Sequence, residues 1–81
     1  MKKTILIIDD HLEIRENTAE ILELSGFNVL KAENGRVGVD VALSSKPDLI
    51  ICDIMMPGLD GYGVLHMLRE NHTSEHSLFI C

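Results

Sequence analysis

The sequence predicts an α/β fold, a doubly wound parallel sheet, from three observations. Short aliphatic runs alternate with segments of helical periodicity, which is typical of a parallel sheet with helices on both faces. Two of the runs are continuously aliphatic, as expected for strands that are buried on both sides. Both of these runs end abruptly in acids, at the strand ends where sheets of this type bind ligands.

The first predicted strand is Thr4–Ile8, an aliphatic run that ends in two aspartates. A helix follows from Leu12 to Ser25, because its apolar residues recur with helical spacing. Gly26 is suited to end this helix, since helices often terminate in a residue with a left-handed backbone. We expect one helical face to gather Ile14, Thr18, Ile21, Leu22 and Ser25.

The middle of the chain repeats the strand and helix pattern. Asn28–Ala32 is the second predicted strand, and a turn at Asn34–Gly35 leads into a helix over Arg36–Ser45 that Pro47 closes. The residues expected to face inward from this helix are Val39, Ala42 and Leu43.

The third strand lies in "DLIICD", which ends in Asp53. After a Pro-Gly loop, Asp60 is a suitable N-cap for a helix through Asn71. The inward residues of that helix are predicted to be Val64, Leu65 and Leu68. "SLFIC" reads as a fourth strand, so residues 1–81 form a single domain in which three strand–helix pairs precede a last strand.

Composition narrows the classes of function. The formal net charge of −6 argues against a nucleic-acid partner, since phosphate backbones attract basic faces. No apolar run approaches the roughly 18 residues of a membrane span, and we expect a cytoplasmic protein. Cys52 and Cys81 are interpreted as reduced thiols, because two cysteines in such a chain do not make a disulfide framework.

Three acids end the two most aliphatic strands, Asp9 and Asp10 after the first and Asp53 after the third. If these strands are neighbours, which would place them about 4.8 Å apart, the three carboxylates converge and require a cation. Oxygen ligands suit a hard ion, and Mg²⁺ is the natural candidate. The alternative for a single acid is an ordinary cap, and Asp10 could simply cap the first helix.

At these residues the chain resembles a known family. The segments "ILIIDD", "AENG" and "LIICDIMMPGLDGYGVL" are similar to the CheY-like receiver domain of two-component response regulators. The resemblance runs from Lys3 to the last residue. It rests on an acid pair, a later acid, a proline four residues beyond that acid, and Asp-Gly opening the next helix.

The resemblance implies a role for each matching residue. Asp53 matches the phosphoacceptor, Asp10 the acid that binds Mg²⁺ directly, and Asp9 the acid that helps through water. Met55 matches the position whose backbone carbonyl completes the metal shell, and Pro57–Gly58 the rim of the pocket. The implied phosphodonor is a sensor histidine kinase, and the receiver is a substrate that assists its own phosphorylation rather than an ordinary enzyme.

The chain also departs from the family pattern. Receivers continue past the fourth strand with a Thr or Ser, a helix, a fifth strand ending in Lys, and a final helix. We therefore expect a truncated receiver over residues 1–81, lacking the last strand and the last two helices. The aliphatic side chains of the first and third strands should then lie open, and a homodimer is expected to cover this sheet face or the edge strand.

Other interpretations stay open at this point. A truncated receiver could act only as a dimerisation or interaction module, or be an inactive fragment. A Mg²⁺-dependent phosphatase with an aspartyl intermediate is disfavoured, because that class usually has acids two residues apart and a downstream Lys. His11 follows the acid pair, near the expected pocket mouth, and we interpret it as a surface residue. His72 and His76 are interpreted in the same way.

Overall fold

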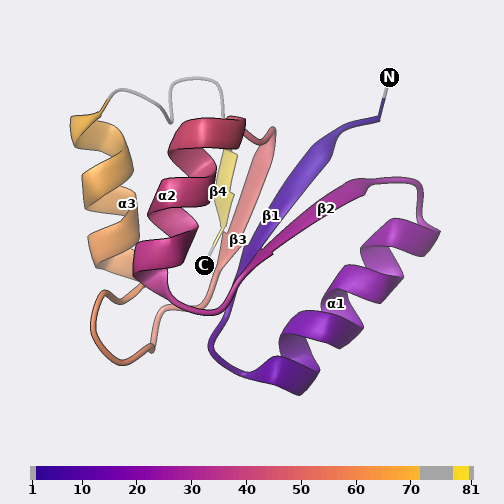
Figure 1. The fold of residues 1–81 in the computed structure, drawn as a ribbon, viewed down its shortest axis with the longest axis horizontal. Helices are drawn as coiled ribbons and strands as arrows, with labels where there is room; N and C mark the ends of the chain where they lie inside the picture. Colours follow the sequence, from indigo (N-terminus) through magenta and orange to yellow (C-terminus); the bar gives the residue numbers. More distant parts are fainter. Residues whose placement is uncertain (1, 72–77, 81) are drawn as a thin grey trace.

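The computed structural model describes residues 2–71 and 78–80. The elements in order are β1 (Thr4–Ile8), α1 (Leu12–Leu24), β2 (Asn28–Ala32), α2 (Gly35–Ser45), β3 (Leu49–Cys52), α3 (Gly61–Glu70) and β4 (Leu78–Ile80) (Figure 1). This alternation confirms the predicted α/β class. His72, His76 and Cys81 lie outside the described residues. No helix in the described part of the chain is long and apolar enough to cross a membrane.

All four described strands are parallel, in the order β2-β1-β3-β4. The second strand of the chain, β2, therefore lies on one side of β1, and the third, β3, lies on its other side. Ile8 pairs with Ala32 on one side and with Cys52 on the other. Because β1 and β3 are in register up to their last residues, the residues that follow them emerge side by side, as a switch-point sheet requires.

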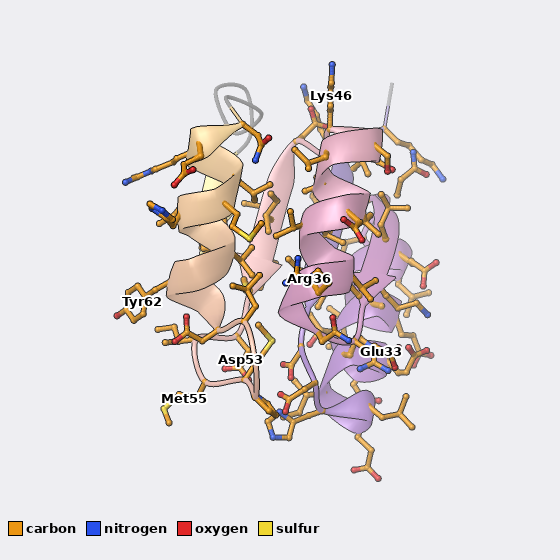
Figure 2. The ribbon with its side chains drawn as sticks, turned by 60° about the vertical axis from the view of Figure 1, so that its left-hand side comes forward. Glu33, Arg36, Lys46, Asp53, Met55 and Tyr62 are labelled. Carbon is orange, nitrogen blue, oxygen red and sulfur yellow. The ribbon has the colours of Figure 1, made fainter. Side chains whose placement is uncertain are left out.

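Helices cover the two faces of the sheet in different ways. Figure 2 shows α2 and α3 side by side on one face, with α1 behind the sheet. Under α2 and α3 lies the larger core, which includes Leu6, Ile8, Ile50, Val64 and Leu68, each at most 1% exposed. A smaller core forms beneath α1, where Ile5, Ile7 and Ala19 are buried.

The helix ends follow from local chemistry. Gly26 has φ +98°, and the backbone N–H groups of Gly26 and Phe27 donate to the carbonyls of Glu23 and Leu22. This pair of bonds is the Schellman arrangement, so Gly26 ends α1 as predicted. Asp60 caps α3 through its carboxylate, which accepts from the Gly63 N–H at 2.9 Å.

The helix α2 begins at Gly35, one residue earlier than predicted. The side chain of Asn34 accepts a hydrogen bond from the Val37 N–H at 2.9 Å and so serves as the N-cap. Val39 and Ala42 are buried and Leu43 packs against the core, which confirms the inward face predicted for this helix. Cys52 is buried, as expected for a reduced thiol.

Two expectations about the α1 side of the sheet were wrong. The first strand is not open, because α1 lies over it and leaves Ile5 and Ile7 only 3% exposed. The predicted inward face of α1 is also rotated, since Ile14 is 53% and Ile21 63% exposed while Ala19 is buried. Leu22 of the predicted face does pack against the core, and Arg15 and Ala19 lie on the packed side with it.

The part of the sheet left open is that over β3 and β4. Leu49 and Ile51 are only partly buried, and Ile80, which pairs with Ile51, is 53% exposed. Glu16, on the opposite flank of α1 from Ile14 and Ile21, pairs with Lys31 of the edge strand β2 at 3.0 Å. The flank that carries Ile14 and Ile21 therefore faces β3. We call Ile14, Ile21, Leu49, Ile51 and Ile80 the open apolar face.

The close approach of α2 to β1 generates a first prediction. A Cβ at Gly38 would lie 2.4 Å from Cδ1 and 2.7 Å from Cγ1 of Ile8, a side chain that is fully buried. Overpacking of this kind costs about 1–3 kcal/mol, which exceeds the gain of up to about 1 kcal/mol in helix propensity. We expect Gly38→Ala to lower the free energy of unfolding in urea.

The control for this prediction is Asp40→Ala, which changes an exposed position in the same helix. It should leave the free energy of unfolding unchanged or slightly higher. A Gly38→Ala variant as stable as the Asp40→Ala variant would show that α2 does not pack closely on β1.

Candidate functional site

The candidate site is built at the carboxyl ends of β1 and β3. The Asp9 N–H donates to the carbonyl of Ala32 at 3.1 Å, and the Asp53 N–H donates to the carbonyl of Ile8 at 2.9 Å. These bonds continue the sheet ladder by one residue on each strand. They hold the Cα atoms of Asp9 and Asp53 at the carboxyl ends of the two strands, where their side chains enter a common space.

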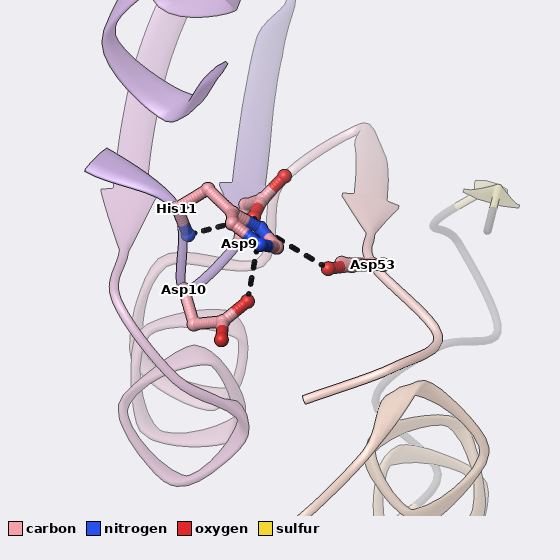
Figure 3. A group of neighbouring side chains, drawn as sticks. All are labelled: Asp9, Asp10, His11 and Asp53. Carbon is pink, nitrogen blue, oxygen red and sulfur yellow. Dashed lines mark hydrogen bonds and ion pairs between the residues drawn. The ribbon is translucent and has the colours of Figure 1, made fainter. Parts of the chain in front are cut away.

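Asp9, Asp10 and Asp53 meet in this space together with His11, as Figure 3 shows. Each of the four offers one ligand atom, and these atoms all lie within 4.8 Å of one another. The side chains of Asp9, Asp10 and Asp53 are 15%, 28% and 27% exposed. The convergence of the three acids predicted from the sequence is therefore confirmed.

His11 contacts all three acids. Its Nδ1 lies 2.9 Å from a carboxylate oxygen of Asp9, 3.2 Å from one of Asp10 and 3.7 Å from Oδ2 of Asp53. The pKa of His11 is raised above its ordinary value, first by the hydrogen bond to Asp9 and then by the charge of Asp10. The prediction of a surface residue was right about exposure, but it missed this membership of the site.

The chain after β3 orients the Asp53 carboxylate. The Met55 N–H donates to Oδ1 of Asp53 at 3.3 Å, while the Met55 side chain is 81% exposed and points away from the site (Figure 2). A Cβ at Gly61 would lie 2.8 Å from the Asp53 carbonyl oxygen and from Cα of Ile54. The start of α3 thus packs directly on the backbone that carries Asp53. The role of the Met55 carbonyl as a metal ligand stays a prediction.

The donor set fits a hard divalent cation. Three carboxylates supply several oxygens within one small space, which is the ligand type that Mg²⁺ prefers. Their partial exposure leaves room for the water that Mg²⁺ usually retains. Without a cation the carboxylates repel one another, and a protonated His11 ring beside them offsets part of this repulsion.

Arg15 is a second residue near the site, besides His11, that the sequence reasoning missed. In the sequence Arg15 stands among acidic residues, outside the set predicted to face inward from this helix. In the structure its side chain is only 12% exposed, and its Nη1 donates to the carbonyl of Asp9 at 2.8 Å. A cation in the first turn of the helix that follows the acid pair was the available signal.

A parallel sheet with acids at its switch point defines the class of protein, a flavodoxin-like α/β domain with an acidic pocket at the carboxyl ends of its strands. The profile of the response regulator receiver domain matches residues 5–81. The chain belongs to this family, as the resemblance implied.

Individual relatives agree with this assignment. The chain is 44% identical over 69 residues to the phosphate regulon transcriptional regulatory protein PhoB of Pseudomonas aeruginosa. These 69 residues are 85% of this chain but 30% of that relative. The solved structure of the chemotaxis protein CheY4 of Vibrio cholerae superposes with a TM-score of 0.92 at 25% identity, over 98% of this chain and 66% of that one.

A third similar protein was solved with ligands. The response regulator TrrA of Thermotoga maritima, in complex with Mg²⁺ and BeF, superposes with a TM-score of 0.82 at 30% identity, over 99% of this chain and 85% of that one. The 81 residues thus span under a third of the PhoB relative and about two thirds of the CheY4 structure.

The crowding of the acids generates a prediction about stability. In EDTA at pH 8, we expect Asp53→Asn to raise the free energy of unfolding by about 1 kcal/mol, the Coulomb energy of two charges about 4 Å apart in water. The amide oxygen can still accept the Met55 N–H, so the change removes the charge and the 3.7 Å contact of Oδ2 with His11. Urea unfolding at low and high salt measures the effect, which salt should reduce.

Glu20→Gln, an exposed carboxylate on α1, is the control and should change stability little. A loss of stability in Asp53→Asn would contradict the prediction, because it would mean that favourable contacts of the carboxylate outweigh the repulsion.

Proposed function

We propose that this chain is the phosphoacceptor of a two-component pathway, and that Asp53 takes a phosphoryl group from a sensor histidine kinase with Mg²⁺ held by Asp9, Asp10 and the Met55 carbonyl. The observation that supports this most directly is the convergence of the three carboxylates within 4.8 Å at two adjacent strand ends. Membership of the receiver family supports the same role.

The chemistry follows from the site. A carboxylate oxygen of Asp53 attacks the phosphorus of the donor, so that an O–P bond forms while the P–N bond to the donor histidine breaks. The electron pair of the broken bond returns to the imidazole. Oδ1 of Asp53 accepts a hydrogen bond from the Met55 N–H and Oδ2 faces His11, so both carboxylate oxygens are oriented by neighbours at the pocket.

Electrostatics sets the requirement for a metal. The incoming phosphoryl group is anionic and must approach three carboxylates. Mg²⁺, when bound, screens this repulsion and stabilises the charge that develops on the phosphoryl oxygens. Asp9 and Asp10 contribute by holding the cation beside Asp53. The complex of the TrrA relative with Mg²⁺ and BeF supports Mg²⁺ as the cation proposed for this chain.

The chain is proposed to be a substrate that assists its own phosphorylation, and not an enzyme with turnover of its own. An assay of this function therefore measures the phosphorylation of one aspartate in each molecule and not a rate of turnover. The functional partner is the kinase, and no nucleic-acid or membrane contact is proposed for residues 1–81, which we propose to act as one domain.

This function predicts labelling by a small phosphodonor. Incubation with acetyl phosphate and Mg²⁺ should add one phosphoryl group, seen by mass spectrometry of the intact chain. The group should be absent in Asp53→Asn and in EDTA. Asp40→Asn, which removes an exposed carboxylate from α2, should be labelled like the wild type. Equal labelling of the wild type and Asp53→Asn would overturn the assignment of the phosphoacceptor.

We further propose that the 81-residue chain forms a homodimer. The open apolar face places partly buried or exposed aliphatic side chains of α1, β3 and β4 on one surface, and surfaces of this kind tend to be covered by a partner. The edge strand β4 adjoins it, so a second copy can cover the face or pair with the edge. Burial of each side chain contributes about 1.5–3 kcal/mol, a large part of the stability of a domain of this size.

Sedimentation velocity at micromolar concentration tests the dimer. We expect a dimer for the wild type, dissociation for Ile21→Lys, and a dimer for Leu12→Lys. Leu12 is 62% exposed, and it lies half a helical turn away from Ile21 around α1, outside the open apolar face. A compact folded monomer of the wild-type chain would refute the proposal.

A further inference from the structure

Arg15 connects α1 to the acid pair through the backbone. Its side chain is 12% exposed, and its Nη1 donates to the Asp9 carbonyl at 2.8 Å. Its own N–H donates to the carbonyl of His11 at 2.9 Å and begins the helix. The segment from Asp9 to Arg15 is therefore closed by two hydrogen bonds that both involve Arg15.

The hydrogen bonds at Asp9 show what Arg15 contributes. The Asp9 N–H is bound to the Ala32 carbonyl, and the Asp9 carboxylate accepts from the His11 N–H at 2.9 Å. The Asp9 carbonyl is bound to Arg15. This carbonyl belongs to the peptide between Asp9 and Asp10, so its orientation helps to determine where the Asp10 side chain points.

Glu16 is a second neighbour of the Arg15 guanidinium. The Arg15 Nε lies 3.9 Å from a carboxylate oxygen of Glu16, but Glu16 has a closer partner in Lys31 at 3.0 Å. The guanidinium is thus directed mainly at the Asp9 backbone.

We propose that Arg15 is a positioning residue for the acidic site. It holds the Asp9–Asp10 peptide so that both carboxylates face Asp53, while it does not itself touch the metal or the phosphoryl group. The effect on the metal rests on the proposed function. The effect on the order of the loop does not, because the hydrogen bond exists without a ligand.

The test compares Arg15→Met, which keeps the aliphatic stem, with Arg15→Lys, which keeps the charge. Groups that orient metal ligands typically change metal affinity by about 10–100-fold when removed. We expect Arg15→Met to weaken the Kd for Mg²⁺, measured by calorimetry, by about tenfold, and Arg15→Lys to restore part of this loss. Arg36→Met removes an exposed arginine from α2 and should bind Mg²⁺ like the wild type.

A second readout separates positioning from a merely structural role. In acetyl phosphate labelling, the Mg²⁺ concentration for half-maximal rate should rise in Arg15→Met, while the rate at saturating Mg²⁺ stays close to that of the wild type. An Arg15→Met chain with wild-type Mg²⁺ affinity and wild-type half-saturation would overturn the proposal.

A third readout needs no metal. In EDTA, the amide resonances of Asp10 and His11 should shift and broaden in Arg15→Met, while that of Met55 stays in place. Unchanged amides would overturn the inference even if the wild type binds no Mg²⁺, a result that would by itself reject the proposed function. If Arg15→Met does not fold, Arg15→Lys decides the matter, and wild-type affinity together with wild-type amides in that variant would overturn the need for a guanidinium.

Discussion

The structure depends on one constraint, the crowding of three carboxylates where two parallel strands end. Because β1 and β3 are in register up to Ile8 and Cys52, the residues that follow them, Asp9 and Asp53, lie side by side. Burial on both faces fixes that register, because a shift by one residue would exchange the side chains of the two cores. The burial of the aliphatic cores beneath α1 and beneath α2 and α3 thus keeps the three carboxylates together in spite of their electrostatic repulsion.

Neighbouring elements oppose this repulsion in different ways. His11 adds a nitrogen that contacts all three acids, and Arg15 binds the backbone between two of them. On the other strand, the Met55 N–H binds Asp53 and Gly61 lets α3 begin against the backbone of Asp53. The carboxylates are therefore held near one another before any cation arrives, which reduces the reorganisation that metal binding would require.

The sequence was sufficient for the fold and for the acids because both follow from short-range patterns. Thr4–Ile8 and the run ending at Cys52 are aliphatic and terminate in aspartates, and parallel pairing then brings those aspartates together. The rotation of α1 was not predictable in this way, since its apolar residues lie on two flanks and only packing decides between them. Arg15 was missed for a related reason: a long side chain can leave a polar helix face and bury its stem.

The same architecture couples the site to stability. An 81-residue chain buries a modest share of its surface, so its folded state is marginal. A ligand that binds only the folded state stabilises it by about 2.7 kcal/mol at a concentration of 100 times its Kd. For this chain that amount is comparable to the burial of one or two side chains of the open apolar face. Occupancy of the acidic site and coverage of the open apolar face would thus contribute to one folding equilibrium.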